Sequence, residues 1–359
     1  MVNSFELTIQ IGLIVRIKLT SLFKSFLPLV FCSNLWAGTV QLQPIGDVTT
    51  WPDTPFRWMD IADFQYRDSY LSSFTYDEPS VTLTFCDTAN TFSGTLTATG
   101  LKPNFAYQVK LVGKPQTVWG ADGDNWTNEQ IGYAGRWWRK QPNPGNSNDA
   151  DYEAHKDYPA YIFEGYLLFD FFVADEQGSA ALNFFADSSF HVLWATHDST
   201  GDGPGHRDPG SNDSAVRYID FTASPTTNSD AYYFDYGAAH VGIYAEWQSD
   251  RDPPGEIVLA PGAYNCQLIL TEESFHQSDL GGGWASVLGY DDINFTLVPF
   301  NEGDIDRDGS VDGSDLAGFA VSYAAGDPEA DLNDDGSVNA SDVAVFAEQF
   351  GNNTCRAGI

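Results

Sequence analysis

The sequence reads DIDRDGSVDGSD at residues 304–315 and DLNDDGSVNASD at residues 331–342. Corresponding positions of the two segments lie 27 residues apart, as Asp304 and Asp331 do. Each segment has the spacing of a twelve-residue calcium loop, in which oxygen ligands come from positions 1, 3, 5, 7, 9 and 12 and glycine stands at position 6. A repeat that preserves this spacing favours a pair of calcium sites over a solvated acidic tail.

Two Ca²⁺ ions are therefore the predicted cofactors, with side-chain oxygens and one backbone carbonyl per loop as ligands. The predicted ligands of the first ion are Asp304, Asp306, Asp308, the carbonyl of Ser310, Asp312 and Asp315. Those of the second are Asp331, Asn333, Asp335, the carbonyl of Ser337, Asn339 and Asp342. Gly309 and Gly336 stand where the chain must turn sharply. Val311 and Val338, at position 8, are expected to join the two loops through a short β-contact.

A helical pattern follows each loop. Leu316, Phe319 and Tyr323 form an i, i+3, i+7 stripe. The second helix repeats this stripe with Val343, Phe346 and Phe350. The segment 299–303 is predicted to be a linker, and a Gly-Asp-Pro break separates the repeats, so neither loop has an entering helix.

This order of loop then helix, twice, resembles the type I dockerin family, which closes its loops with Asp rather than Glu at position 12. The resemblance covers residues 304–359 and implies a small α-helical domain that folds with calcium and docks onto a cohesin domain of a scaffold or cell-surface protein. In that family, loop positions 10 and 11 help to choose the partner, which implies a role for Gly313, Ser314, Ala340 and Ser341. The alternative is a structural calcium module that docks nothing.

The remaining composition limits the partners. Among 359 residues, Lys and Arg number 17 against 50 Asp and Glu, a formal net charge of −33. Such a charge argues against binding to nucleic acid or to an anionic membrane surface.

Residues 1–37 have the pattern of an export signal: basic residues precede the apolar run at 26–32, and Ala37 is a small residue suited to cleavage. Lipidation of Cys32 is an alternative, although Phe31 is bulky for such processing. A second apolar segment at 11–15 suggests that the start codon lies further downstream. Without a later apolar stretch of about twenty residues, no membrane span is expected. The mature protein is expected to be secreted and either free or attached to a cell surface.

Cleavage would leave three cysteines, at 86, 266 and 355. Export permits disulfides, and Cys86 and Cys266 lie in strand-like runs that could pair across a sandwich. Two buried thiols are the alternative.

Residues 38–298 are expected to form an antiparallel β-sandwich or jelly roll, because short runs of Val, Thr, Phe and Tyr alternate with turn residues. The predicted strands are 81–86, 93–98, 107–112, 161–173, 180–185, 191–194, 216–221, 241–247, 256–259, 267–271 and 293–298. The segments around Tyr107 and Tyr264 resemble the tyrosine corner of fibronectin type III and immunoglobulin-like domains, in which a tyrosine bonds back to upstream backbone.

Residues 113–158 leave the strand pattern and form a long polar insert rich in tryptophan. Trp119, Trp126, Trp137 and Trp138 are candidates for a carbohydrate-binding face. Alternatively, these tryptophans close a minor core over one sheet. A second polar loop at 197–214 could hold a further metal, although turn residues alone also explain its composition.

No zinc, phosphate-loop, dinucleotide or serine-elbow motif is present, so the catalytic residues are unknown. Carboxylates in or beside apolar strands, where burial raises a pKa, are Glu164, Asp170, Glu246, Glu272 and Glu273. Two hypotheses remain. One is a non-catalytic β-domain, a structural or carbohydrate-binding module, delivered to an assembly by its dockerin-like module. The other is a dockerin-bearing glycoside hydrolase that degrades polysaccharides.

Overall fold

The computed structural model describes residues 37–45, 59–77, 79–114, 125–198, 215–233, 237–247, 259–273, 284–306 and 309–351. The chain forms two compact units, one containing Ala37–Val298 and the other Pro299–Cys355. The predicted export signal lies outside the described residues, except for Ala37, which begins the first strand. Among the helices described, none is long and apolar enough to cross a membrane.

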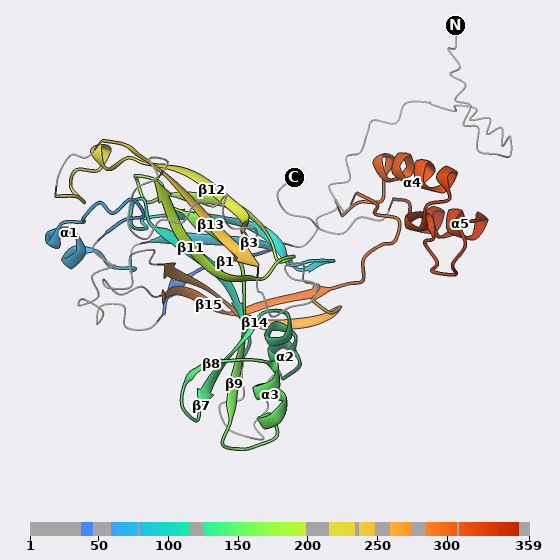
Figure 1. Cartoon of the computed structure of the whole chain (residues 1–359), viewed down its shortest axis with the longest axis horizontal. Coiled ribbons are helices and arrows are strands. Elements are labelled where there is room, and N and C mark those ends of the chain that lie inside the picture. The colour runs from blue at the N-terminus through green and yellow to red at the C-terminus, as the bar shows by residue number, and fades with distance from the viewer. Residues whose placement is uncertain are drawn as a thin grey trace, which may run out of the picture. The chain divides into compact units, whose positions relative to one another are not determined.

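The unit containing Ala37–Val298 is mainly β (Figure 1), and almost all neighbouring strands in its described sheets run antiparallel, as predicted. The exception is β4, which pairs with β15 in parallel. The four-stranded sheet has the order β1 (Ala37–Gln41), β3 (Ser80–Cys86), β5 (Ser93–Thr99), β10 (Ala180–Phe185). The eight-stranded sheet has the order β2 (Gln43–Pro44), β15 (Trp284–Leu297), β14 (Gly262–Glu273), β6 (Ala106–Val112), β9 (Ile162–Val173), β7 (Arg136–Gln141), β8 (Gly145–Ser147), with β4 (Thr88–Ala89) beside β15. The three-stranded sheet has the order β11 (Phe190–Asp198), β13 (Ala239–Trp247), β12 (Ala215–Ala223).

Most of the predicted strands are present. The prediction for β10 has the observed bounds, while β14 and β15 are longer than predicted. The short strands β1, β2 and β4 and the pair β7 and β8 were not predicted. The predicted strand at 256–259 lies outside the described residues except for Leu259, which is not in a strand.

The main core lies between the four-stranded and the eight-stranded sheets. Leu83 of β3 and Phe184 of β10 belong to the same buried cluster as Val109 of β6, Phe169 of β9 and Leu270 of β14. Alternate residues of each strand supply these side chains, as expected where one face of a sheet is buried. The two sheets therefore pack face to face.

The strand β6 is buried along its whole length, which shows that the second face of the eight-stranded sheet is also covered. Ala106 on that face clusters with Phe171 of β9 and with Val241 and Ile243 of β13. The three-stranded sheet thus covers one part of this face. The part of the same face nearer to β7 carries the pocket described below.

The segment 113–158 is not the polar loop that the sequence suggested. From residue 125 it forms α2 (Asn125–Ala134), β7, β8 and α3 (Asp149–His155). Because β7 pairs with β9, the segment extends the eight-stranded sheet. Figure 1 shows these elements gathered at one end of β9. The prediction failed because β7, with the sequence RWWRKQ, lacks apolar alternation and depends on its partner strand.

Both tyrosines of the predicted corners bond to upstream backbone. The Tyr264 hydroxyl donates to the Ala260 carbonyl at 2.7 Å. The backbone N–H of Lys102 donates to the Tyr107 hydroxyl at 3.1 Å. This local geometry ties the start of β14 and of β6 to the turn before it.

The suggested bridge between Cys86 and Cys266 is wrong. Cys86 is disulfide-bonded, whereas Cys266 is a buried thiol in the main core. The remaining cysteine, at 355, lies outside the described residues. Among the described residues, the large unit also contains the short helices α1 (Asp68–Ser73) and η4 (Pro225–Thr227).

The other unit contains α4 (Gly313–Ala325), the short η5 (Pro328–Ala330) and α5 (Ala340–Gln349). The rings of Phe319 and Phe346 stack with centroids 4.8 Å apart at its centre. Val311, Ala330 and Leu332 complete its buried cluster. Both helices follow the repeat, since Phe346 stands 27 residues after Phe319.

Candidate functional site

Three carboxylates converge in the first predicted calcium loop. Asp304, Asp306 and Asp315 each place a carboxylate oxygen within 4.8 Å of those of the other two. Asp304 is 6% exposed and Asp315 is 1% exposed. The predicted ligand Asp308 lies outside the described residues.

The backbone of the first loop wraps around two of these carboxylates. The N–H groups of Asp306 and Asp312 donate to Oδ1 and Oδ2 of Asp315 at 3.1 and 2.8 Å. The N–H of Gly309 donates to Oδ2 of Asp304 at 2.9 Å. Positions 1 and 12 of the loop are thus linked to its middle.

The second loop repeats these bonds at the same positions. The N–H groups of Asn333 and Asn339 donate to Oδ1 and Oδ2 of Asp342 at 3.3 and 2.7 Å. The N–H of Gly336 donates to Oδ2 of Asp331 at 2.7 Å. Since the same five positions are bonded in both copies, the repeat in sequence is also a repeat in geometry.

The glycine at position 6 is required by the backbone in both loops. Gly309 has φ of 92° and Gly336 has φ of 82°, values that side chains of L-residues disfavour. A Cβ on Gly336 would meet no atom within 4 Å. The requirement at Gly336 is therefore conformational and not a matter of space.

Each loop also begins the helix that follows it. Asp312 and Asp315 form a capping box at the start of α4, and Asn339 and Asp342 form one at the start of α5. A capping box satisfies backbone N–H groups that the first helical turn leaves without partners. Positions 9 and 12 therefore connect each loop to its helix.

The donor set fits a hard cation, because the predicted side-chain ligands are all carboxylates or amides, whose oxygens suit calcium. The first loop has carboxylates at all five of its side-chain ligand positions, whereas the second has three carboxylates and two asparagines. The carbonyl of Ser337 accepts a bond from Asn339 Nδ2 at 2.9 Å. Val338 packs against the same cluster as the buried Val311, which places position 8 of both loops in one core.

The helices of this unit enclose an apolar groove with a volume of about 330 Å³. Its lining is Leu316, Phe319, Ala320, Tyr323, Val343, Phe346, Ala347 and Phe350. Every α4 residue in the lining has its counterpart 27 positions later, so the two repeats contribute equally. The residues at positions 10 and 11, which are Gly313, Ser314, Ala340 and Ser341, are exposed at the helix starts.

The structure separates the three described tryptophans of the predicted ligand face. Trp137 is fully buried and stacks on Tyr152 at 3.7 Å, within a minor core that also contains Phe163. Trp126 is 36% exposed on α2 and packs on Tyr264. Trp138 lines a pocket on the large sheet, and Trp119 lies outside the described residues.

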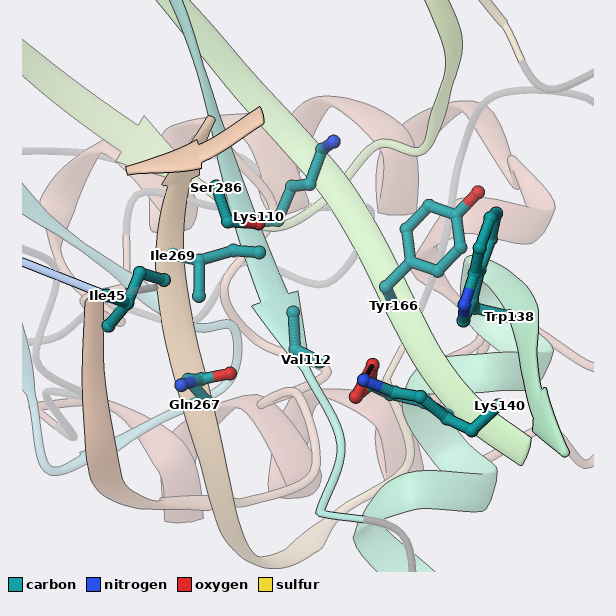
Figure 2. A pocket seen from close by; sticks show the side chains of 10 residues that line it. Ile45, Lys110, Val112, Trp138, Lys140, Tyr166, Gln267, Ile269 and Ser286 are labelled. Atoms are coloured by element: carbon teal, nitrogen blue, oxygen red, sulfur yellow. Dashed lines mark ion pairs between the residues drawn. The ribbon is translucent and has the colours of Figure 1, made fainter. Parts of the chain in front are cut away.

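That pocket, with a volume of about 170 Å³, is formed by alternate residues of adjacent strands (Figure 2). Its lining is Trp138 and Lys140 of β7, Glu164 and Tyr166 of β9, Lys110 and Val112 of β6, Gln267 and Ile269 of β14, Ser286 of β15, and Ile45. Residues two apart on a strand share a face of the sheet, so the pocket is a hollow in one sheet face.

Two lysines and one glutamate give this pocket its charge. Lys140 Nζ lies 2.6 Å from Glu164 Oε1. Burial raises the pKa of Glu164, and the bond from Lys140 lowers it by a smaller amount. Burial also lowers the pKa of Lys110 to about 8, against the attraction of Glu273. Both groups thus sit where their charged forms are disfavoured by partial removal from water.

Of the other carboxylates that the sequence singled out, two are held in ion pairs. Glu272 pairs with Lys102 at 2.9 Å, with both side chains buried. Asp170 pairs with Arg217. Glu273 accepts a bond from Gln108 at 2.6 Å. The side chain of Glu246 lies outside the described residues.

Sequence reasoning missed most of this pocket. The sequence predicts Trp138 as part of a ligand face and Glu164 as a carboxylate beside an apolar strand. It does not predict a role for other polar residues of the lining, such as Lys110, Lys140, Tyr166 and Gln267. The sequence does contain one signal, since Lys110 is the one charged residue of the fully buried strand β6. The partners could not be found without the strand order, because they come from segments far apart in the chain.

No family model matches this chain, and no curated protein or solved structure matches it.

Proposed function

We propose that this protein is a secreted calcium-binding protein of the dockerin type, which attaches its β-domain to a cohesin-bearing scaffold or cell surface. The observation that carries the proposal is the matched geometry of the two loops. In each loop the carboxylate at position 12, Asp315 or Asp342, accepts hydrogen bonds from the backbone N–H groups of positions 3 and 9. Calcium would be held by Asp304, Asp306 and Asp315 in the first loop and by their counterparts in the second. The ion would supply the folding free energy that a small core lacks.

The apolar groove between α4 and α5 is the surface that suits a protein partner. Leu316, Val343 and Phe350 in its lining are 42, 40 and 50% exposed. Apolar side chains exposed side by side are typical of interaction sites. The exposed residues at positions 10 and 11 lie at the starts of the same helices, where they would contact the cohesin.

Calcium titration of the full chain by calorimetry tests the first half of this proposal. We expect two binding events in the wild-type protein and the loss of one in Asp331→Asn/Asp335→Asn. Asp334→Asn is the control, since it removes one carboxylate of the same loop at position 4, which supplies no ligand, and Asn tolerates the φ of 55° found there. Wild-type protein that binds no calcium would refute the proposal.

Capture of a cohesin domain by the full chain, in calcium and in chelator, tests the second half. Leu316→Asp with Val343→Asp should abolish capture and leave calcium binding unchanged. Val321→Asp is the control, because Val321 is 71% exposed on α4 but does not line the groove. Calcium binding without capture of any cohesin would support a structural calcium module that docks nothing.

A polysaccharide-degrading hydrolase docked in the same way is the second candidate, favoured by the raised pKa of Glu164 in a pocket with two aromatic side chains. Most glycoside hydrolases need two carboxyl groups at the bond that is cleaved. Among the described residues of the pocket, Glu164 is the single carboxylate. The pocket therefore suits sugar binding better than hydrolysis. If the wild-type protein released reducing sugar from a polysaccharide and Glu164→Gln did not, hydrolysis would be the better assignment.

A further inference from the structure

The pocket on the large sheet is built on rigid neighbouring strands. Trp138 of β7 stands opposite Glu164 of β9, Tyr166 of β9 stands opposite Val112 of β6, and Val112 stands opposite Gln267 of β14. The floor is thus one continuous hydrogen-bonded ladder across four strands. Side chains held on strands keep their relative positions better than side chains on loops, so the hollow is a preformed site.

The pocket concentrates positive charge in a strongly acidic protein. Lys and Arg total 17 in the chain against 50 Asp and Glu, yet Lys110 and Lys140 both line this one hollow. Lys140 is neutralised by Glu164 at 2.6 Å. Lys110 is the second cation of the lining, and Glu273, which does not line the pocket, attracts it.

The burial of the Lys110 side chain is unfavourable for its charged form. Lys110 is 5% exposed, with Nζ 5.9 Å from the centre of the Tyr166 ring. Burial disfavours its charge and lowers its pKa, which Glu273 opposes only in part. An apolar residue such as the neighbouring Val112 would avoid this cost. A negatively charged ligand in the pocket would offset it.

The aromatic side chains indicate the shape of the ligand. Figure 2 shows Trp138 and Tyr166 next to each other on one side of the pocket, with Gln267 and Ile269 on the other. Gln267, whose Nε2 also donates to Asp291, and Ser286 add hydrogen-bonding groups. The volume of about 170 Å³ is below the roughly 300–1,000 Å³ of sites for drug-sized molecules, so it admits a single ring and not an extended chain.

We propose that this pocket binds one acidic sugar unit of a polysaccharide, a pyranose ring that carries a carboxylate or a sulfate. The ring would lie against Trp138 and Tyr166, the anionic group would be paired by Lys110, and Gln267 and the Lys140–Glu164 pair would bond its hydroxyl groups. The inference does not rest on the calcium loops. Neither the net charge of the chain nor its motifs predict an acidic sugar as the ligand of the β-domain.

Calorimetric titration of the full chain with three trisaccharide probes tests the proposal: an oligogalacturonate, a sulfated galactan fragment and neutral galactotriose. We expect at least one acidic probe to bind about tenfold or more tightly than the neutral one, since hydrogen bonds between ionised groups are stronger than those between neutral groups. The two acidic probes distinguish carboxylate from sulfate. Equal affinity for all three probes, or binding of none, would overturn the proposal.

Substitutions locate the site. Lys110→Met should lose the preference for the acidic probe, and Lys110→Arg should keep part of it. Lys114→Met is the control, because Lys114 pairs with exposed Asp292 and does not line the pocket, and it should leave both affinities unchanged. Circular dichroism establishes that each variant is folded. A folded Lys110→Met protein that retains the full acidic preference would contradict the assignment.

A chelator separates this inference from the proposed docking function. Binding of the acidic probe by the wild-type chain should persist in chelator, since no predicted calcium ligand lines the pocket. Loss of calcium binding in the loop variants should likewise leave sugar binding intact. Each proposal can therefore fail while the other stands.

Discussion

At the scale of single residues, the β-domain contains a buried ion pair that connects two strands to a turn. Glu272 of β14 is fully buried and pairs with Lys102, which precedes β6. The Tyr76 hydroxyl donates to Glu272 and lies 3.1 Å from the Tyr107 hydroxyl. Burial, and to a smaller extent the charge of Glu272, raise the pKa of both tyrosines, which keeps them neutral donors.

Glu272→Gln should destabilise the β-domain by about 3–5 kcal/mol, because it leaves Lys102 buried without its counter-charge. Asp292→Asn is the control: it breaks the exposed pair with Lys114 and should cost less than about 1 kcal/mol. Urea unfolding followed by near-ultraviolet circular dichroism measures both. Equal effects of the two substitutions would show that the buried pair contributes no more than a surface pair.

Asp60 is a second buried carboxyl, and it should make stability depend on pH. It accepts bonds from the N–H groups of Ala62 and Phe64 and from the Tyr232 hydroxyl, yet burial raises its pKa from 3.8 to about 7. The folded state therefore keeps this proton at pH values where the unfolded state has lost it. Its contribution to stability falls as pH rises from about 4 to about 7.

Asp60→Asn removes that titration, so the stability of the wild-type protein relative to the variant should fall by about 2–3 kcal/mol between pH 5 and pH 8. Denaturant midpoints of both proteins at the two pH values measure the difference, in which the titration of all other carboxyl groups cancels. A constant difference would show that Asp60 is ionised in the folded protein throughout this range.

At the scale of elements, the loops and helices of the smaller unit were predictable because every determinant is local. Ligand spacing, Gly309 and Gly336, and the apolar stripes all lie within one repeat. Strands such as β3 and β10 were found for a similar reason, since their apolar alternation is visible in seven or fewer residues. By contrast, β7 becomes part of the sheet only through β9, and the sequence of β7 alone does not indicate this.

Gly336→Ala should weaken the calcium-dependent folding of this unit by about 1–2 kcal/mol, because an L-residue must adopt a φ of 82° there. Gly313→Ala is the matched control, since a Cβ at either position meets no atom within 4 Å, and Gly313 lies in α4 without a positive φ. Helical circular dichroism as a function of free calcium measures both. A Gly313→Ala protein as impaired as Gly336→Ala would indicate a steric cause instead of a conformational one.

At the scale of the whole molecule, the chain forms two units with separate cores. The main core contains residues such as Leu83, Phe169 and Leu270, whereas the smaller core is centred on Phe319 and Phe346. The pocket could not be predicted from sequence for the same reason that β7 could not: Lys110, Lys140 and Gln267 meet only through the strand order. The predicted calcium loops were visible in the sequence because each is continuous in the chain.

Differential scanning calorimetry in calcium and in chelator should therefore show two transitions, of which only one shifts. A ligand that binds the folded state at a hundred times its dissociation constant stabilises that unit by about 2.7 kcal/mol. The transition of the β-domain should stay in place, and its strand signal should persist in chelator. A shift of both transitions would indicate a further calcium site in the β-domain.

The stacked rings of Phe319 and Phe346 have a consequence for the origin of the smaller unit. Each ring comes from one repeat and finds its main partner in the other, so a lone repeat would leave its phenylalanine in water. An ancestral gene with a single copy would have encoded a peptide that folds only as a homodimer. Duplication would then have fused the two subunits into one chain, and a synthetic peptide of one repeat should still associate with its twin when calcium is supplied.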